Sequence, residues 1–214
     1  MYSVIKRGLP VAALLVAFVF SGIGQIQAQE KKAGGETMAG AVLAEDRIEG
    51  SADAPVTIIE YSSFTCPHCA SFHTDVYPGL KKKYIDTGKV KIIFRAFPLD
   101  PLAAAASMLA QCVEKDNFFP FIDVLFKQQK NWAYSQSPVE SLRKISLQAG
   151  LSSDSFESCL KNQKLLDSIL RVKDEAVKEL KINSTPTFEV NGEVVRGSLP
   201  LKEFEKLIEA KLRK

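Results

Sequence analysis

The sequence is poor in the residues that build metal sites and lacks the charge imbalance that nucleic-acid binding needs. It contains two histidines and four cysteines, and only one pair of cysteines has the close spacing of metal ligands. Basic residues number 28 and acidic residues 25, so the composition does not favour a polyanionic partner. We therefore expect neither a metal site nor a nucleic-acid partner.

Long apolar runs are also scarce, and the one that stands out lies near the N-terminus. Two basic residues precede an apolar stretch over residues 9–20, and small residues before Gln29 offer a cleavage site. The stretch is shorter than the roughly 20 residues of a spanning helix, and no cysteine follows it as a lipid acceptor. We interpret residues 1–28 as a secretory signal peptide, with an uncleaved membrane anchor as the alternative.

In an exported chain the four cysteines can form stable disulfides, because disulfides persist outside the cytoplasm. Cys66 and Cys69 form a local pair, whereas Cys112 and Cys159 each stand alone in a segment with a helical pattern. An even number of cysteines in an exported chain favours a second, structural disulfide between Cys112 and Cys159 over two independent buried thiols. The sequence does not show whether these two segments lie close enough to be bridged.

Residues 29–47 show no sustained hydrophobic periodicity. We predict a flexible leader there, with a short helical piece over residues 38–45. The elements predicted after the leader follow the order β-α-β, then a helical block, then β-β-α. This order predicts one small α/β layer, made by residues 48–100 and 182–214, with a helical domain over residues 101–181 inserted between its halves.

The predicted elements are separated by turn residues. Two strands, over residues 56–61 and 90–97, flank a helix over residues 67–85 that Pro78-Gly79 should interrupt. A β-helix-β unit of this length implies parallel strands and a right-handed crossover. The remaining predictions are helices over 103–113, 119–130, 139–149, 153–161 and 163–180, a hairpin over 187–196 turning at Asn191-Gly192, and a closing helix around 201–208.

The most informative motif is Cys66-Pro67-His68-Cys69, which follows a strand and opens a helix. Two thiols at this spacing can form an easily exchanged disulfide. Free N–H groups and the helix dipole favour a thiolate at the helix start, so Cys66 should be the exposed, attacked sulfur. Pro67 suits the first helical turn, and the His68 ring can add to the stabilisation of the thiolate. Cys69, one turn deeper, is expected to be the buried, resolving sulfur.

The Cys-Pro-His-Cys motif after a strand, the helical insertion and the dipeptide Thr185-Pro186 before a hairpin together resemble the bacterial disulfide-oxidase family DsbA. The resemblance extends from about Asp46 to the C-terminus. It implies a thioredoxin-like α/β fold with an inserted helical domain. It further implies a periplasmic, monomeric oxidoreductase that introduces disulfides into reduced, unfolded secreted proteins through Cys66 and Cys69. Such a protein needs no bound cofactor and is reoxidised by a membrane protein of the DsbB type.

The resemblance also gives roles to the residues before the hairpin. Pro186 matches the family's cis-proline, which packs against the active disulfide, although an ordinary trans proline would be the expectation without it. A cis bond would turn the backbone of Thr185 toward Cys66, where it can pair with an extended substrate peptide. Thr185 is therefore a candidate substrate-binding residue.

Glu60 lies six residues before Cys66, where the family carries a buried acid. Strand alternation puts Glu60 among apolar residues, where its carboxyl group could exchange a proton with Cys69. A solvated glutamate at the strand end is the alternative. The family's positively charged partner for this acid has no secure match, and Arg95 is a candidate. His73 is expected to lie on the helix surface or to take part in helix packing.

Other functions stay open on the sequence alone. The same cysteine pair could serve a disulfide reductase or isomerase, although residues 29–50 are too short for the dimerisation domain that such isomerases usually add. The chain could also be a non-enzymatic binding module with a structural Cys66–Cys69 bridge. Trp132 and the phenylalanines over residues 118–126 are expected in the core of the helical block, and some could line an apolar substrate groove.

Overall fold

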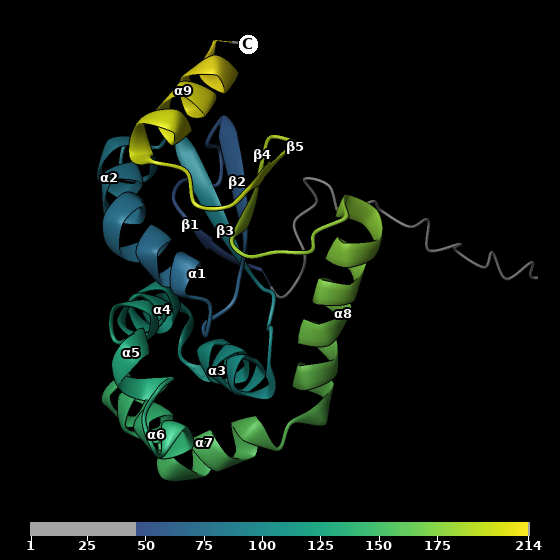
Figure 1. Cartoon of the computed structure of the whole chain (residues 1–214). Helices are drawn as coiled ribbons and strands as arrows, with labels where there is room; N and C mark the ends of the chain where they lie inside the picture. Colours follow the sequence, from purple (N-terminus) through teal and green to yellow (C-terminus); the bar gives the residue numbers. More distant parts are fainter. Residues whose placement is uncertain (1–45, 214) are drawn as a thin grey trace, which may run out of the picture. The chain divides into compact units, whose positions relative to one another are not determined.

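The computed structural model describes residues 46–213 of the chain, which form a five-stranded mixed sheet with helices on both faces (Figure 1). The strand order is β1-β3-β2-β4-β5, in which β2 and β3 run parallel and the other neighbours run antiparallel. The parallel pair joined by a helix confirms the predicted β-helix-β unit. The strands are β1 (Arg47–Glu49), β2 (Val56–Ser62), β3 (Val90–Ala96), β4 (Thr187–Val190) and β5 (Glu193–Arg196).

The crossover helix changes between α- and π-helical hydrogen bonding three times. Two α-helical pieces, α1 (Pro67–Ser71) and α2 (Tyr77–Leu80), alternate with two π-helical turns, η1 (Phe72–Val76) and η2 (Lys81–Ile85). The interruption expected at Pro78 is therefore a local change to π-helical hydrogen bonding and not a break. Pro78 lies in the first turn of α2 and has no N–H to donate to the preceding turn. The segment as a whole spans the predicted residues 67–85.

The helical block between β3 and β4 follows the sequence pattern closely. An N-cap from Asp100, whose carboxylate accepts a hydrogen bond from Ala103 N at 2.8 Å, starts its first helix. The helices are α3 (Pro101–Cys112), a 3₁₀ turn η3 (Lys115–Asn117), α4 (Phe118–Lys127), α5 (Gln129–Trp132), α6 (Pro138–Gln148), α7 (Ser153–Leu160) and α8 (Gln163–Leu180); α9 (Leu201–Leu212) closes the chain.

The leader ends earlier than predicted. Arg47 belongs to β1, whose residues pair with β3 at the edge of the sheet. A three-residue strand is too short to show an alternating pattern, which is why the sequence did not reveal it. The signal peptide, the rest of the leader and the predicted helical piece over 38–45 lie outside the described residues. Within residues 46–213, no helix combines the length and the apolar character needed to cross a membrane.

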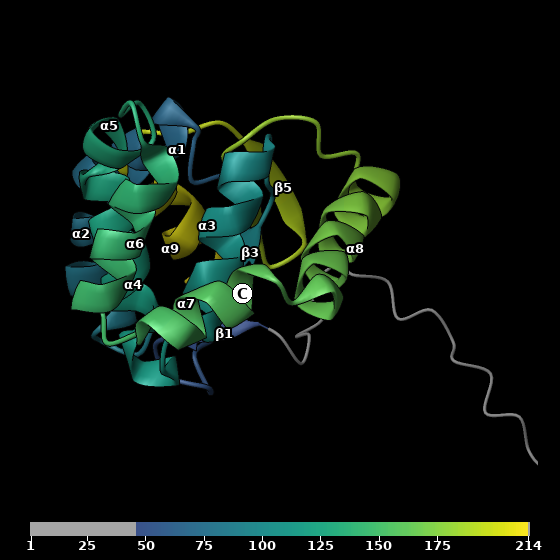
Figure 2. The same cartoon turned by 90° about the horizontal axis from the view of Figure 1, so that it is seen from below.

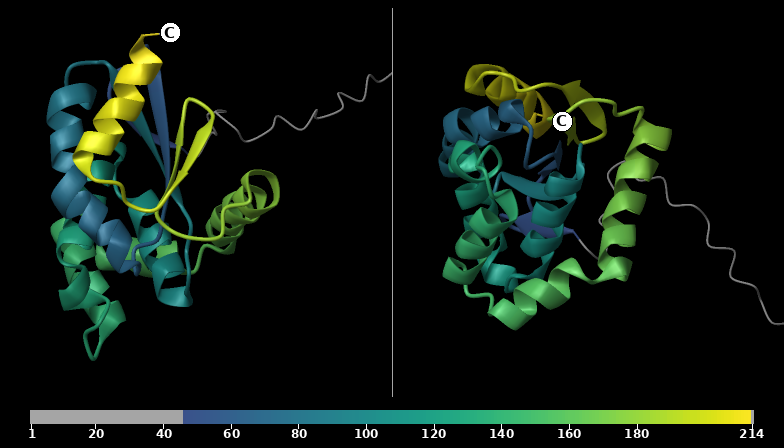
Figure 3. Two further views of the ribbon diagram at one scale, coloured as in Figure 1. Left: turned by 45° about the horizontal axis from the view of Figure 1, so that its top comes forward. Right: turned by 60° about the horizontal axis from the view of Figure 1, so that its bottom comes forward.

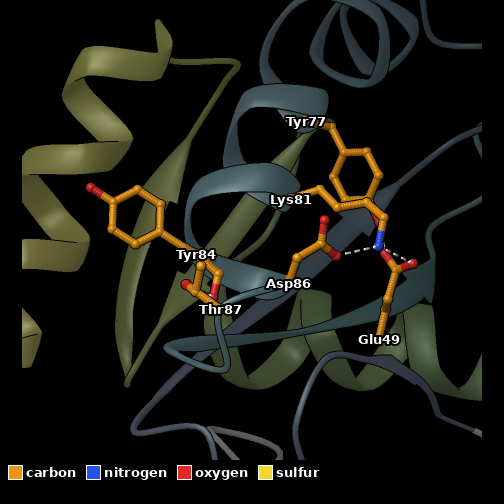
Figure 4. Close-up of polar contacts among 6 residues, drawn as sticks. All are labelled: Glu49, Tyr77, Lys81, Tyr84, Asp86 and Thr87. Carbon is orange, nitrogen blue, oxygen red and sulfur yellow. Dashed lines mark hydrogen bonds and ion pairs between the residues drawn. The ribbon is translucent and has the colours of Figure 1, made fainter.

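Polar contacts fasten β1 to the crossover helix (Figure 4). Lys81 Nζ lies 2.9 Å from Glu49 Oε1 and 2.9 Å from Asp86 Oδ1. The Tyr77 hydroxyl donates a further hydrogen bond to the Glu49 carboxylate. Burial and the neighbouring Glu49 charge raise the pKa of Tyr77, so its hydroxyl stays protonated and can act as this donor.

The sheet has two different faces, set by the pleat of β2. Val56 and Ile58 point toward the crossover helix and α9, whereas Ile59 and Tyr61 point toward the face that α8 covers. Figures 1 and 2 show α8 on the opposite side of the sheet from α2 and α9. The alternation predicted for this strand is confirmed.

The core of the helical block continues into the start of the crossover helix. The Trp132 ring is fully buried, and its Nε1 donates a hydrogen bond to Leu125 O at 2.7 Å. One apolar cluster joins Trp132 and the phenylalanines of α4 to Cys66 and Cys69. Helices α3, α4, α6 and α7 contribute residues to this cluster. The helical block that they form is seen from two further sides in Figure 3. Most of these aromatic residues are therefore core residues, and they pack in the same cluster as the two cysteines.

Candidate active site

The cysteine motif lies at the start of α1, shortly after the end of β2. Cys66 is the N-cap of the helix and has an extended backbone, and Pro67 occupies the first helical position. Cys66 N donates to Ser63 O at 3.1 Å, and Ala70 N donates to Cys66 O at 3.2 Å. This arrangement leaves the first N–H groups of the helix pointing toward the Cys66 sulfur.

A residue from the helical block holds the turn that carries Cys66. The buried Gln129 side chain donates from Nε2 to Phe64 O at 2.8 Å and to Cys66 O at 2.9 Å. On the other side of the turn, Thr65 Oγ1 donates to Asp100 Oδ2 at 2.5 Å. Neither contact was foreseen, because the partners lie far apart in the sequence and no local pattern marks them.

The two thiols differ in environment: Cys69 is buried as predicted, and Cys66 is more enclosed than predicted. Both are free thiols in the structure. Cys69 is fully buried, whereas Cys66 is 6% exposed and not openly exposed as predicted. The Thr185 backbone and the core of the helical block cover Cys66 and leave its sulfur a narrow access.

The environment lowers the pKa of Cys66 to about 5, mainly because the Cys69 thiol donates a hydrogen bond to its sulfur. The Thr185 hydroxyl and the backbone N–H groups of His68 and Cys69 add to this effect, against the desolvation caused by burial. Burial raises the pKa of Cys69, and donating to Cys66 raises it further. One sulfur is thus held as a thiolate and the other as a thiol.

The side chain of His68 is exposed, and the stabilising role expected for its ring stays a prediction. The backbone N–H of His68 is among the groups that favour the Cys66 thiolate. The physical reason is its place at the start of a helix, where the N–H groups point at the N-cap and the side chain points outward.

The Thr185–Pro186 peptide bond is cis in the structure, as the resemblance implied. The Cys66 thiol lies 3.4 Å from Thr185 O, so the residue before the proline touches the sulfur. Thr185 Oγ1 is buried and has no hydrogen-bond partner among the described residues. Its hydroxyl can therefore turn to the Cys66 sulfur when that sulfur carries the charge.

Glu60 is 1% exposed, which excludes a solvated position at the strand end. Its partner is His73, whose Nε2 lies 3.0 and 3.1 Å from the two carboxylate oxygens. His73 is itself 2% exposed, so it is neither a surface residue nor a packing residue alone. The spacing of four residues from Cys69 would have placed it on the same buried helix face.

Arg95 is not the partner of Glu60. In the parallel register Arg95 lies opposite Tyr61, and neighbouring residues of a strand point to opposite faces of the sheet. Arg95 instead contacts Asp46, with Nη2–Oδ2 at 2.8 Å and Nε–Oδ1 at 3.0 Å, and donates to the Tyr61 hydroxyl at 3.0 Å. This buried pair anchors the segment that leads into β1.

Cys112 and Cys159 are joined by a disulfide, with an S–S distance of 2.04 Å and a Cα–Cα distance of 6.2 Å. It links α3 to α7 inside the helical block and leaves Cys66 and Cys69 as the exchangeable pair. No group of three or more side chains suited to a metal ion occurs in the part of the chain that the structure describes.

An apolar groove of about 500 Å³ opens beside the Thr65–Asp100 contact, between α3, α7 and α8. Its lining is mainly aliphatic, including Leu99, Met108 and Leu170, and also contains Asp100 and Lys173. Most of the aromatic residues that the sequence offered for such a groove lie in the core, whereas Phe119 and Phe121 line two other pockets.

Comparison with known proteins places this site in a family. Residues 43–210 match the family model described as Thioredoxin. A Rickettsia typhi protein named "Putative protein-disulfide oxidoreductase" is 36% identical over 148 residues, which cover 69% of this chain and 55% of that protein. The chain thus spans little more than half the length of that relative.

Two other similarities cover more of the related protein. A Bacillus anthracis protein named "Probable disulfide bond formation protein D" is 30% identical, with 77% of each chain covered. The crystal structure of Wolbachia pipientis alpha-DsbA1 superposes with a TM-score of 0.74 at 35% identity, covering 79% of this chain and 92% of that one. With the sheet order, the helical insertion and the cysteine site, these matches show that the chain belongs to the thioredoxin family as a DsbA-type protein.

Proposed function

We propose that this protein is an exported thiol:disulfide oxidoreductase that introduces disulfides into other proteins through Cys66 and Cys69. The observation that carries the proposal is the opposite shift in the pKa values of the two thiols. The pKa of Cys66 is lowered to about 5 and the pKa of buried Cys69 is raised. A stable Cys66 thiolate favours the reduced protein, so the oxidised protein should readily transfer its disulfide to a substrate dithiol.

The reaction is a pair of exchanges. A substrate thiolate attacks the Cys66 sulfur, the Cys66–Cys69 bond breaks, and its electron pair stays on the Cys69 sulfur, which takes up a proton. A second substrate thiolate then attacks the substrate sulfur of the mixed disulfide and releases Cys66 as a thiolate. The substrate is oxidised by two electrons and the cysteine pair is reduced by two.

The surroundings of Cys66 suit an unfolded polypeptide as substrate. The Thr185 backbone lies against the Cys66 sulfur, at 3.4 Å, where it can form main-chain hydrogen bonds with an extended segment. The groove lined by Leu99, Met108 and Leu170 begins next to the same turn and can receive an apolar side chain of that segment. Reduced, unfolded secreted proteins combine both features.

The cellular setting is part of the proposal. We place the mature protein in the periplasm as a monomer, exported by residues 1–28 and reoxidised by a DsbB-type membrane protein. The Wolbachia relative is named a DsbA and the Bacillus relative a probable disulfide bond formation protein, which supports this setting. N-terminal sequencing of the exported protein, with cleavage before Gln29 as the expected result, tests the first step.

The activity is tested by mixing the oxidised protein with a peptide that contains two free cysteines. We expect stoichiometric oxidation of the peptide and reduction of Cys66 and Cys69. Cys66→Ala should abolish the exchange, whereas a variant lacking Cys112 and Cys159 should retain it. Failure of the wild-type protein to oxidise the peptide would favour a binding module with a structural bridge.

The direction of the reaction is tested by equilibration with glutathione. An oxidase should be found reduced in mildly oxidising mixtures, because its thiolate is stable. If the cysteine pair stays oxidised there, a reductase is the better description.

A further inference from the structure

We propose that the apolar groove between α3, α7 and α8 is a selectivity subsite. It takes a large apolar side chain that stands about two or three residues from the reacting cysteine of the substrate. Asp100 at its mouth disfavours an acidic residue in the same segment. The inference rests on the proposed function and adds the sequence preference of the substrate.

The mouth of the groove adjoins the residue that precedes the attacked sulfur. Asp100 lines the groove, and its Oδ2 accepts a hydrogen bond from Thr65 Oγ1 at 2.5 Å. Thr65 is bonded to Cys66, and the Cα atoms of neighbouring residues are about 3.8 Å apart. An extended polypeptide advances about 3.3 Å per residue. A substrate held by its cysteine at Cys66 therefore brings its second or third neighbouring residue to the groove.

The rim that carries Leu99 is fixed on two sides. Toward the cysteine motif, Leu99 N donates a hydrogen bond to Ser63 Oγ at 3.4 Å. Toward α8, Lys173 Nζ donates to Pro98 O at 2.7 Å. The groove is thus formed before a substrate arrives, so its walls need little ordering when the substrate binds.

The lining offers apolar area to a bound side chain. Leu99 on the rim is 51% exposed and Leu170 on α8 is 37% exposed, so both leave apolar surface in contact with water. The floor includes Met108, which is buried in the same cluster as Cys66. A side chain such as leucine that enters the groove removes its own apolar surface and that of the lining from water, which favours binding.

The two charged residues of the lining act differently. Lys173 directs its amine to Pro98 O on the rim. Asp100 presents a carboxylate at the mouth, whose oxygens accept hydrogen bonds from the uncharged Thr65 hydroxyl and from Ala103 N at 2.8 Å. A substrate carboxylate beside the reacting cysteine would lie close to this negative charge and be repelled by it. Uncharged and basic residues meet no such repulsion.

The substrate is the occupant that the chemistry requires. Each exchange places a substrate cysteine on Cys66, so the residues on one side of that cysteine pass the mouth of the groove. The Thr185 carbonyl, 3.4 Å from the Cys66 sulfur, belongs to the backbone that can pair with the same segment in an extended form. The groove and the main-chain contact therefore act on one stretch of polypeptide.

The test compares dithiol peptides that differ at a single position, on either side of the first cysteine, where they carry Leu, Ser or Asp. The rate constant for reduction of the Cys66–Cys69 disulfide in the oxidised full chain is measured with each peptide at neutral pH. It is divided by the rate constant with glutathione, so that changes in Cys66 itself cancel. In the wild-type protein we expect Leu at the best position to exceed Ser by about fivefold or more. Asp should be slower than Ser by about twofold or more.

Variants of the groove locate the preference. Leu170→Gln removes apolar area from the α8 wall and Ala105→Phe fills the groove from α3, so each should reduce the advantage of Leu over Ser to less than about twofold. Val177→Gln is the matched control, because Val177 is 43% exposed on the same helix and does not line the groove. It should keep the wild-type ratio. Asp100→Asn keeps an acceptor for Ala103 N and should bring the Asp peptide level with the Ser peptide.

Equal rates with the Leu and Ser peptides in the wild-type protein would overturn the inference and leave the proposed function standing. A Leu advantage that survives both Leu170→Gln and Ala105→Phe would also overturn it, because the side chain would then be recognised elsewhere. An equal loss in Val177→Gln would have the same meaning. A wild-type disulfide that no dithiol peptide reduces would refute the proposed function, and the inference with it.

Discussion

The side-chain amide of Gln129 lies 2.9 Å from the main-chain oxygen of Cys66, although 63 residues separate the two. A second bond from the same nitrogen reaches Phe64 O. The helical block therefore holds the turn that aims the Cys66 sulfur, and this contact gives the inserted domain a direct part in the site.

Replacing Gln129 by Leu should remove the donor to the buried Phe64 O and leave Cys66 O with the Ala70 N–H alone. We expect a loss of about 1–3 kcal/mol in the free energy of unfolding, measured by urea denaturation. Gln128→Leu is the matched control, because the side chain of Gln128 is exposed and should change stability little. Equal effects of the two substitutions would show that the amide contact is not important for stability.

The rate of Cys66 alkylation by iodoacetamide in the reduced protein should reach half its maximum near pH 5, since the pKa of Cys66 is lowered to about 5. Cys69→Ala removes the hydrogen bond that contributes most, so the midpoint should move toward the usual thiol range, about 8.5. Cys69→Ser keeps a hydroxyl donor and should lie between the two. A midpoint that is the same in all three proteins would contradict this account.

Reduction of the Cys66–Cys69 disulfide should stabilise the fold at neutral pH. The pKa of Cys66 is lower in the folded protein than in the unfolded chain, so the thiolate contributes stability that is lost as pH falls through about 5. The melting temperature of the reduced protein should exceed that of the oxidised protein at pH 7, and the difference should shrink toward pH 4. Calorimetry of both forms tests this, with a Cys66→Ala/Cys69→Ala variant as the control without a redox-dependent shift.

Removal of the Cys112–Cys159 disulfide should affect stability and not the chemistry of Cys66. The double Ala variant should lose about 2–4 kcal/mol, because the unfolded chain regains the freedom of a long loop. The pH midpoint of Cys66 alkylation should stay where it is, since the groups that lower the pKa of Cys66 belong to the cysteine motif and Thr185 and not to this disulfide. A shifted midpoint would show that the helical block tunes the site through this bridge.

Local patterns were enough to predict most of the secondary structure and the cysteine motif. The hairpin at Asn191-Gly192 and the helices of the inserted block lie within a few residues of their expected places. Such features depend on neighbours in the sequence, through turn geometry and helical periodicity. Strand β1 escaped prediction, because three residues make no pattern and its stability comes from pairing with β3.

The partners of the buried polar residues could not be predicted in the same way. Arg95 was a reasonable partner for Glu60 by charge, but the parallel register places it opposite Tyr61 and therefore on the other face of the sheet. His73 was the true partner, and its distance of four residues from Cys69 was the one local hint. Register is set by the whole sheet, so the sequence of one strand does not contain it.

By itself the sequence determined which residues can exchange a disulfide and that a helix begins at Cys66, because motif spacing and capping are local properties. Only the tertiary structure decided what surrounds the cysteine motif: the Thr185 carbonyl 3.4 Å from the Cys66 sulfur and the Gln129 amide behind the turn. Reactivity of a thiol follows from the charges and hydrogen bonds around it, and chain segments far apart in the sequence supply them here.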